Sequence, residues 1–250
     1  MDLTQNIKAV QERIAAAARA AGRDPASVTL CAATKVQSDE AIRSAIAAGV
    51  RVCGENRVQE LTAHLAADAY AGAEVHFIGH LQTNKVKQVV GKASLIHSVD
   101  SERLLRAIDR QAEALGLVQD ILLEVNVARE ESKGGILPEN LPALAQAAWS
   151  CPHVRLRGLM AIPPVAAVSG DNRKYFEQMR HFLVDIIDKM SDNQNSVDCL
   201  SMGMSGDYED AIAEGATLVR VGTALFGPRP PMTGTTSTSR KEDCTDGNYF

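Results

Sequence analysis

The segment Val28-Thr-Leu-Cys-Ala-Ala-Thr-Lys35 predicts a buried strand that ends in a lysine. Its uninterrupted run of apolar and small residues is typical of a strand that is covered on both faces of a sheet. Seven further β-rich runs follow it along the chain. The eight predicted strands comprise residues 28–34, 50–54, 75–79, 95–99, 120–127, 154–160, 197–202 and 217–221.

Longer helical patterns separate these strands, and an amphipathic helix within residues 1–22 precedes them. Eight strands that alternate with helices in a chain of 250 residues predict an α/β fold, a (β/α)₈ TIM barrel with one extra N-terminal helix. A doubly wound sheet is the competing architecture, and the count of eight strands favours the barrel. The main predicted helices comprise residues 39–48, 57–67, 84–90, 102–114, 138–148, 173–190 and 208–214.

Glycines follow several of these helices, as expected for left-handed C-caps. They are Gly22, Gly49, Gly91, Gly116 and Gly215. Residues 1–229 are predicted to form a single barrel domain. Residues 230–250 are rich in threonine and serine and poor in apolar residues, so they predict a disordered tail.

The composition indicates a folded chain and excludes several classes of protein. Hydrophobic residues make up 45% of it, and 26 basic against 31 acidic residues give a net charge of −5 without a basic stripe, so we expect no nucleic-acid partner. We expect no membrane association, because no apolar run is long enough to span a bilayer and the acidic N-terminal helix does not resemble a signal peptide. The protein is expected to be cytoplasmic. We also expect a monomer, since a barrel closes its own sheet.

The five cysteines predict neither a disulfide framework nor a nucleophile. They form no Cys-x-x-Cys pair, and Cys31, Cys53 and Cys199 fall in predicted strands, where a small buried hydrophobic residue is the simplest interpretation. No metal site is expected either. His76 and His80 are four residues apart, but they span a strand and its turn, so helical spacing does not bring them together.

Lys35 is the first candidate site residue, because active sites of such barrels lie at the carboxyl ends of the strands. If Lys35 faces the barrel mouth, alternation along the strand turns Ala33 and Cys31 inward beneath it and leaves room for a ring. A lysine in a partly apolar pocket has a lowered pKa and can form a Schiff base. The alternative is an ordinary solvated lysine at a strand end.

Two small-residue turns near the end of the chain predict a phosphate site. Ser201-Met-Gly-Met-Ser-Gly206 follows the seventh predicted strand, and Gly222-Thr223 follows the eighth, the places where such barrels commonly bind phosphate. Gly206 and Gly222 allow close backbone approach, Ser205 and Thr223 supply hydroxyl groups, and the helix that starts after Asp207 can direct its N-terminus at the anion. Asp207 suits the N-cap of that helix. The alternative is a pair of ordinary strand-to-helix turns.

Arg220 lies within the eighth predicted strand and is expected to face the barrel interior together with Leu218. A buried guanidinium needs a partner. A phosphate or a pyridine nitrogen would serve, and so would Glu124 in a structural ion pair. An arginine at a pyridine nitrogen keeps that nitrogen unprotonated, which disfavours demanding carbanion chemistry.

The sequence resembles the pyridoxal phosphate homeostasis family, small single-domain proteins similar to the barrel half of alanine racemase (the fold-type III barrel of pyridoxal phosphate proteins). The resemblance extends to about residue 228. Its carriers are Ala33-Thr-Lys35, Gly54-Glu-Asn56, Arg57-Val-Gln-Glu60, His76-Phe-Ile-Gly-His-Leu-Gln-Thr-Asn-Lys85, His97-Ser-Val-Asp100, Glu124-Val-Asn126, Gly158-Leu-Met160, Ser201-Met-Gly-Met-Ser205 and Val219-Arg-Val-Gly222.

The resemblance implies a cofactor and a set of residues that bind it. Lys35 would hold pyridoxal 5′-phosphate (PLP) as a Schiff base, Asn56 would lie beside the cofactor, and Arg220 would face the ring nitrogen. Ser201 would line the same pocket. The phosphate would be bound by Ser205, Gly206, Gly222 and Thr223.

The resemblance also implies a protein that carries or buffers PLP inside the cell, with PLP-dependent apo-enzymes as recipients and without catalytic turnover. A racemase of the alanine type uses a lysine and, from a separate β domain, a tyrosine on the opposite face. Here Tyr70 and Tyr175 fall in predicted surface segments, Tyr208 begins a helix and Tyr249 is in the tail. A low-activity amino-acid racemase remains the alternative, and an aldolase-like barrel that acts on a sugar phosphate without cofactor is a third hypothesis.

Overall fold

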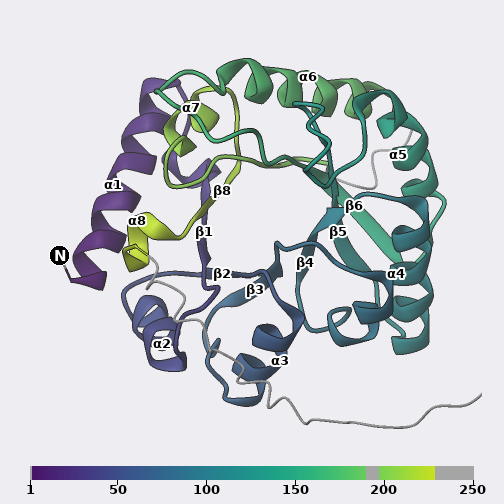
Figure 1. Cartoon of the computed structure of the whole chain (residues 1–250), viewed down its shortest axis with the longest axis horizontal. Coiled ribbons are helices and arrows are strands. Elements are labelled where there is room, and N and C mark those ends of the chain that lie inside the picture. The colour runs from purple at the N-terminus through teal and green to yellow at the C-terminus, as the bar shows by residue number, and fades with distance from the viewer. Residues whose placement is uncertain (1, 190–196, 229–250) are drawn as a thin grey trace, which may run out of the picture.

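The computed structural model describes residues 2–189 and 197–228. Eight parallel strands pair in sequence order, and β8 pairs back to β1, so the sheet is a closed barrel inside a ring of helices (Figure 1). The predicted TIM barrel is confirmed. The strands are β1 Thr29–Ala33, β2 Val52–Glu55, β3 Glu74–Phe77, β4 Leu95–Val99, β5 Gln119–Glu124, β6 Val154–Met160, β7 Cys199–Ser201 and β8 Leu218–Val221.

The predicted helices are present with small changes at their ends. The helix predicted at 84–90 is instead a 3₁₀ helix, Thr83–Gln88, in a segment that contains residues of modest helix propensity, Thr83, Asn84 and Val86. A short helix after β8, Thr223–Phe226, was not predicted. The α-helices are α1 Leu3–Ala20, α2 Asp39–Ala47, α3 Val58–Ala66, α4 Glu102–Leu115, α5 Leu141–Trp149, α6 Arg173–Lys189, α7 Tyr208–Ala213 and α8 Thr223–Phe226, and the other 3₁₀ helices are Pro25–Ser27 and Pro138–Asn140.

The extra N-terminal helix α1 packs on the outside of the barrel against α7 and α8, beside the closure between β1 and β8 (Figure 1). Its buried residues Ile7, Val10, Ile14 and Ala18 follow helical spacing and form one apolar face. The predicted glycine C-caps are confirmed, since all five glycines have positive φ: Gly22, Gly49, Gly91, Gly116 and Gly215.

Side chains alternate between the barrel interior and the helices that surround it. Cys31 and Ala33 point into the interior, where they pack with Val52, Ile78 and Leu218, while the intervening Ala32 belongs to the core under the helices. The predicted inward direction of Cys31 and Ala33 is therefore confirmed. Because these residues are small, the upper interior near β1 stays open toward the carboxyl ends of the strands.

The four described cysteines are free, and burial raises the pKa of each thiol. The pKa of Cys53 is raised to about 12 and that of Cys199 to about 11. The thiols are protonated at neutral pH and pack as small apolar groups.

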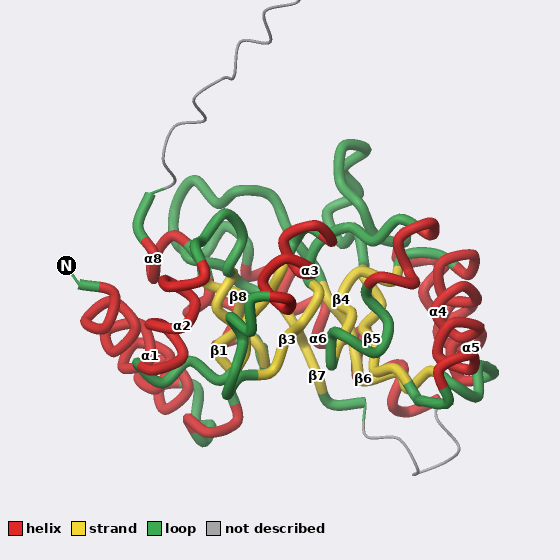
Figure 2. The backbone as a smooth tube through the Cα atoms, turned by 90° about the horizontal axis from the view of Figure 1, so that it is seen from below, coloured by secondary structure: helices red, strands yellow, loops and turns green. Residues whose placement is uncertain are grey.

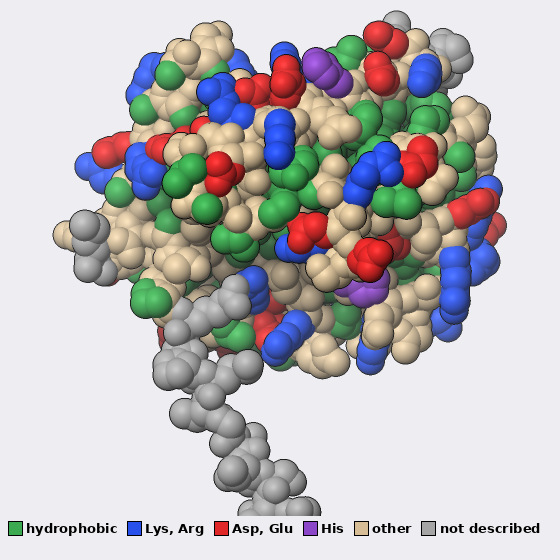
Figure 3. All heavy atoms as spheres, turned by 45° about the horizontal axis from the view of Figure 1, so that its top comes forward, with side chains coloured by type: hydrophobic (Ala, Val, Ile, Leu, Met, Phe, Trp, Pro, Cys, Tyr) green, Lys and Arg blue, Asp and Glu red, His purple; other side chains and the backbone are tan. Residues whose placement is uncertain are grey.

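The loops lie at the two ends of the barrel, outside the strands (Figure 2). On the face shown in Figure 3, basic and acidic side chains are interspersed rather than gathered in a stripe of one sign. Within the described ranges, no helix combines the length and the apolar character needed to cross a membrane. The predicted tail, residues 230–250, lies outside the described residues, so its disorder stays a prediction.

The end of β3 lies so close to the end of β2 that only glycine fits between them. A Cβ atom on Gly79 would lie 2.1 Å from the carbonyl oxygen of Asn56, a contact with backbone that no rotamer change relieves. We expect Gly79→Ala to lower the free energy of unfolding by about 2–3 kcal/mol. Gly206→Ala is the control, because a Cβ there meets nothing within 4 Å. Denaturant titration of both variants measures the difference, and equal stabilities would contradict this packing.

Candidate functional site

A cavity of about 340 Å³ opens at the carboxyl ends of β1, β2 and β8. Its volume falls in the range of roughly 300–1,000 Å³ that is typical of small-ligand sites. Seven of the eight predicted site residues line it. The lining residues are Ala33, Lys35, Gln37, Asn56, Ile78, Ile162, Met204, Ser205, Gly206, Arg220, Gly222, Thr223, Phe226 and Gly227.

Lys35 is half-buried and lies in a turn directly after β1. The backbone N–H of Gln37 donates to the carbonyl oxygen of Thr34 at 3.0 Å, and Val36 has φ of 58°, a strained value for a β-branched residue. The Val36 N–H donates to Glu60 Oε2 at 2.9 Å, which holds this conformation. The side chain of Glu60 in α3 thus helps to determine where the turn places the lysine.

A buried carboxylate behind the turn connects Lys35 to Asn56. Glu55 accepts hydrogen bonds from the Asn56 N–H at 2.7 Å and from the hydroxyl groups of Thr34 and Tyr70, both at 3.2 Å. Burial raises the pKa of Glu55, and its hydrogen bonds oppose that rise. Glu55 therefore holds two segments of the site: Thr34, which precedes Lys35 in the chain, and Asn56, which lies in the cavity wall.

The surface position predicted for Tyr70 is wrong. Tyr70 is 4% exposed, because the turn after α3 folds back onto the barrel and the Glu55 carboxylate accepts a hydrogen bond from its hydroxyl group. Tyr208, at the start of α7, is also buried. Among the described residues, no tyrosine lines the cavity.

The two predicted phosphate loops lie side by side at the cavity. Ser205 Oγ accepts hydrogen bonds from the backbone N–H groups of Gly222, at 3.3 Å, and Ala224, at 3.2 Å. These two N–H groups belong to the start of α8, so the structure adds this helix to the one after Asp207 that was expected to face the anion. A short helix following the last strand is a known place for phosphate in such barrels.

Asp207 lies at the N-cap position of α7, but its side chain does not cap the helix. The carboxylate turns back into the loop, where it accepts from the Met204 N–H at 2.7 Å and from Asn172 Nδ2 at 2.8 Å. The turn at Gly203, with φ of 88°, directs the Met204 N–H toward the Asp207 carboxylate. Asp207 thus fixes the loop that carries Ser205.

Arg220 is 4% exposed, and its side chain lies inside the barrel as predicted. Its guanidinium donates to Ser201 Oγ at 2.5 Å and to the carbonyl oxygen of Ala161 at 2.9 Å. Burial lowers the pKa of Arg220, although a guanidinium stays charged in proteins. Ser201 is fully buried beneath the cavity and does not line it, so the prediction that it lines the pocket is wrong; its hydroxyl group meets the lining residue Arg220.

The ion pair between Arg220 and Glu124 that the sequence allows is absent from the described contacts. Glu124 is 6% exposed at the end of β5, where its carboxylate lies against Gly134. Burial, reinforced by Asp100, raises the pKa of Glu124 to about 7, while Arg220 lowers it. The only acceptors that the described chain offers the guanidinium are thus a hydroxyl and a carbonyl group, both neutral.

Metal ligation finds no support in the described ranges, where no group of three or more histidine, cysteine, aspartate or glutamate side chains is placed to hold an ion. The sequence did not identify several wall residues. Ile78 and Ile162 follow their strands by one or two positions, so the same strand-end rule that selected Lys35 could have found them. Phe226 and Gly227 carried no such signal, because α8 was not predicted.

Comparison with known proteins places the chain in a family. The alanine racemase N-terminal domain matches residues 3–230. The pyridoxal phosphate homeostasis protein of Aquifex aeolicus is 44% identical over 230 residues, which are 92% of this chain and 99% of that protein.

Two solved structures agree with this result. A protein from Bifidobacterium adolescentis described as unknown superposes with a TM-score of 0.83 at 40% identity, covering 90% of this chain and 94% of the other. PipY of Synechococcus elongatus, solved with PLP bound, superposes with a TM-score of 0.76 at 35% identity, covering 90% of this chain and all of PipY (100%). The expected resemblance is confirmed, and the chain belongs to the pyridoxal phosphate homeostasis protein family, built on the alanine racemase N-terminal barrel.

Proposed function

We propose that this protein binds PLP through a Schiff base at Lys35 and serves in PLP homeostasis, holding, buffering or delivering the cofactor. The observation that carries the proposal is the convergence of three kinds of group on one cavity. Lys35 offers an amine, Arg220 a buried cation, and the start of α8 offers backbone N–H groups. A ligand with an aldehyde, a ring nitrogen and a phosphate uses all three.

The residues present fit this group. Asn56 Oδ1 is buried at the cavity without a hydrogen-bond partner, so it can accept from a ligand donor there. Gly206 and Gly222 leave the backbone open to close approach, since a Cβ on Gly206 would meet nothing within 4 Å. Ser205 Oγ already accepts from two N–H groups, which marks where a phosphate oxygen would be bound.

Each residue has a definite task in this proposal. When bound, PLP supplies an aldehyde that condenses with an amine and a ring that can accept electrons. The Lys35 side chain holds the cofactor, and Gly206, Gly222, Thr223 and Ser205 bind the phosphate. Arg220 donates to the ring nitrogen, and because its pKa is far above neutral it does not give up a proton to that nitrogen.

The same features support a role without catalytic turnover. A ring nitrogen that stays unprotonated stabilises a carbanion weakly, and no described tyrosine lines the cavity, so none is placed as a second base opposite Lys35. We propose a cytoplasmic, monomeric carrier formed by residues 1–229, with PLP-dependent apo-enzymes as recipients. Turnover of alanine or another amino acid by the loaded protein would contradict this part and favour the racemase alternative.

The first test is the visible absorbance of the purified protein, followed by borohydride reduction and peptide mass mapping. A reducible yellow chromophore on Lys35 is the expected result. A protein that stays colourless after addition of PLP would overturn the proposal and favour a cofactor-free barrel acting on a sugar phosphate.

Lys35→Ala is expected to keep the fold and lose covalent attachment of PLP, because the half-buried lysine lies in a turn outside β1 and supplies the amine. The measurement is the visible absorbance after equilibration with PLP, together with the mass after reduction. Lys87→Ala, an exposed lysine away from the cavity, is the control and should behave like the wild type. An unchanged chromophore in Lys35→Ala would remove Lys35 from the site.

Arg220→Glu is expected to raise the proton affinity of the ring nitrogen, because a carboxylate replaces the permanent cation beside it. The absorbance of the bound cofactor should then shift, and PLP should bind more weakly. A spectroscopic titration with PLP measures both. If spectrum and affinity both stayed at the wild-type values, Arg220 would not lie at the ring.

A further inference from the structure

A chain of buried polar contacts leads from Arg220 through the interior of the barrel. Ser201 Oγ, which accepts from Arg220, lies 3.0 Å from Nδ1 of His97. Nε2 of His97 lies 3.0 Å from Nδ1 of His76, and Nε2 of His76 lies 3.7 Å from a carboxylate oxygen of Glu74, within ion-pair range. The residues come from β8, β7, β4 and β3 in turn. This series of contacts therefore crosses the barrel.

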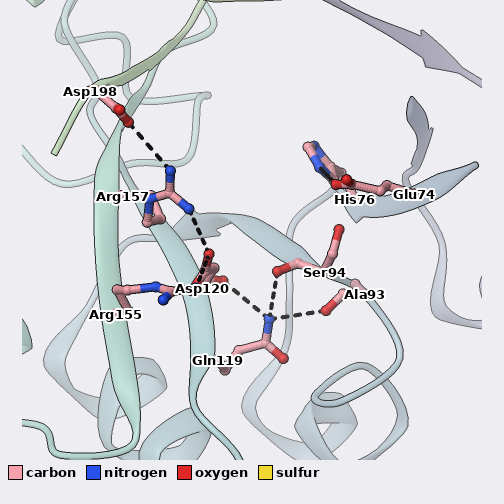
Figure 4. A network of polar contacts seen from close by, with 9 residues as sticks. All are labelled: Glu74, His76, Ala93, Ser94, Gln119, Asp120, Arg155, Arg157 and Asp198. Atoms are coloured by element: carbon pink, nitrogen blue, oxygen red, sulfur yellow. Dashed lines mark hydrogen bonds and ion pairs between the residues drawn. The ribbon is translucent and has the colours of Figure 1, made fainter. Parts of the chain in front are cut away.

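These contacts also run from one mouth of the barrel to the other. Arg220 lines the cavity at the carboxyl ends of the strands, whereas His76 and Glu74 line a cavity of about 270 Å³ at their amino ends. Figure 4 shows this second mouth, where Arg157 joins Asp120 and Asp198 beside the pair of His76 and Glu74. His97 and Ser201 are fully buried between the two.

Both histidines are neutral at neutral pH. Burial lowers the pKa of His97 well below its usual value, and His76 and Arg220 lower it further. Burial lowers the pKa of His76 to about 4, although Glu74 and Asp120 act in the opposite direction. A neutral imidazole donates through one nitrogen and accepts through the other, so each contact has a direction.

One direction satisfies every group. Because Ser201 Oγ accepts from Arg220, its own proton is free to donate to Nδ1 of His97. His97 then donates from Nε2 to Nδ1 of His76, and His76 directs its Nε2–H toward the Glu74 carboxylate. In the opposite arrangement a bare nitrogen of His76 would face that carboxylate, which is repulsive.

We infer that His97 and His76 are positioning residues of the cofactor site, which act through Ser201 by accepting its hydroxyl hydrogen bond and so orienting its oxygen toward Arg220. The inference rests on the proposed function, because the ring nitrogen of PLP is what Arg220 would meet. If His76 no longer accepts from His97, the His97 proton moves to Nδ1 and donates to Ser201. Ser201 Oγ then accepts from both His97 and Arg220 through its two lone pairs, and its own proton loses the imidazole acceptor that oriented it. The hydroxyl group is then less firmly oriented, and so is the guanidinium that donates to it.

The test compares two neutral replacements of His76. Glutamine can accept from His97 through its amide oxygen and donate toward Glu74, whereas leucine fills similar space and does neither. We expect His76→Leu to shift the absorbance of bound PLP and to weaken its binding about fivefold, the effect of one positioning hydrogen bond. His76→Gln should restore wild-type values. Asp198→Asn, at the same mouth but in contact with Arg157, is the control and should leave the cofactor unchanged.

A double-variant cycle tests whether the effect passes through Ser201. Ser201→Ala removes the acceptor of Arg220, so His76→Leu should cause no further change in that background. Ser201→Ala also serves alone if His76→Leu does not fold, since it should reproduce the spectral shift. Wild-type absorbance and affinity in His76→Leu or in Ser201→Ala, or a full effect of His76→Leu in the Ser201→Ala background, would overturn the inference. Failure of wild-type PLP to attach at Lys35 would instead overturn the proposed function.

Discussion

The burial of one positive charge is the constraint on which the interior of this barrel depends. Arg220 is 4% exposed, and its desolvation is costly unless acceptors surround it. The described chain supplies only neutral acceptors, Ser201 and Ala161, so the charge itself is not compensated by an ion pair. The positive charge of Arg220 would therefore stabilise an electron-rich ligand at the mouth without any rearrangement of the protein. This is the physical basis for binding a pyridine ring and a phosphate there.

The closure of the sheet explains why this charge and the lysine share a cavity. β1 pairs with β8 in a register that places Cys31 opposite Arg220, so the chain that continues from β1 reaches Lys35 above the guanidinium. The loop after β7 then meets the start of α8 through Ser205. The segment after β1 and the two neighbouring segments near the end of the chain form one site because the barrel has no edges.

Features that depend on local patterns were predictable from the sequence. Strands, glycine caps and the inward direction of Cys31 and Ala33 follow from composition and alternation within a few residues. The two phosphate loops were predictable because barrels reuse the same strand ends.

Features that depend on long-range contacts were not predictable in this way. The burial of Tyr70 needs Glu55 across α3, the loop contact of Asp207 needs Asn172, and Ser201 is held below the cavity by the guanidinium of Arg220. Each partner lies well outside the window in which a sequence pattern is recognised. Single polar side chains that satisfy buried groups leave no periodic signal.

The pairing of the first strand with the last also determines when the pocket forms during folding. The amine comes from the segment after β1 and the anion-binding N–H groups from the start of α8, so a nascent chain has no complete pocket until its final strand has been synthesised and has docked. Such contacts of high sequence separation form late and slowly. A ligand that bridges both segments binds only the closed barrel and shifts the folding equilibrium toward it by mass action. The bound cofactor would thus stabilise the pairing of β1 with β8, and its presence would indicate that the barrel has closed.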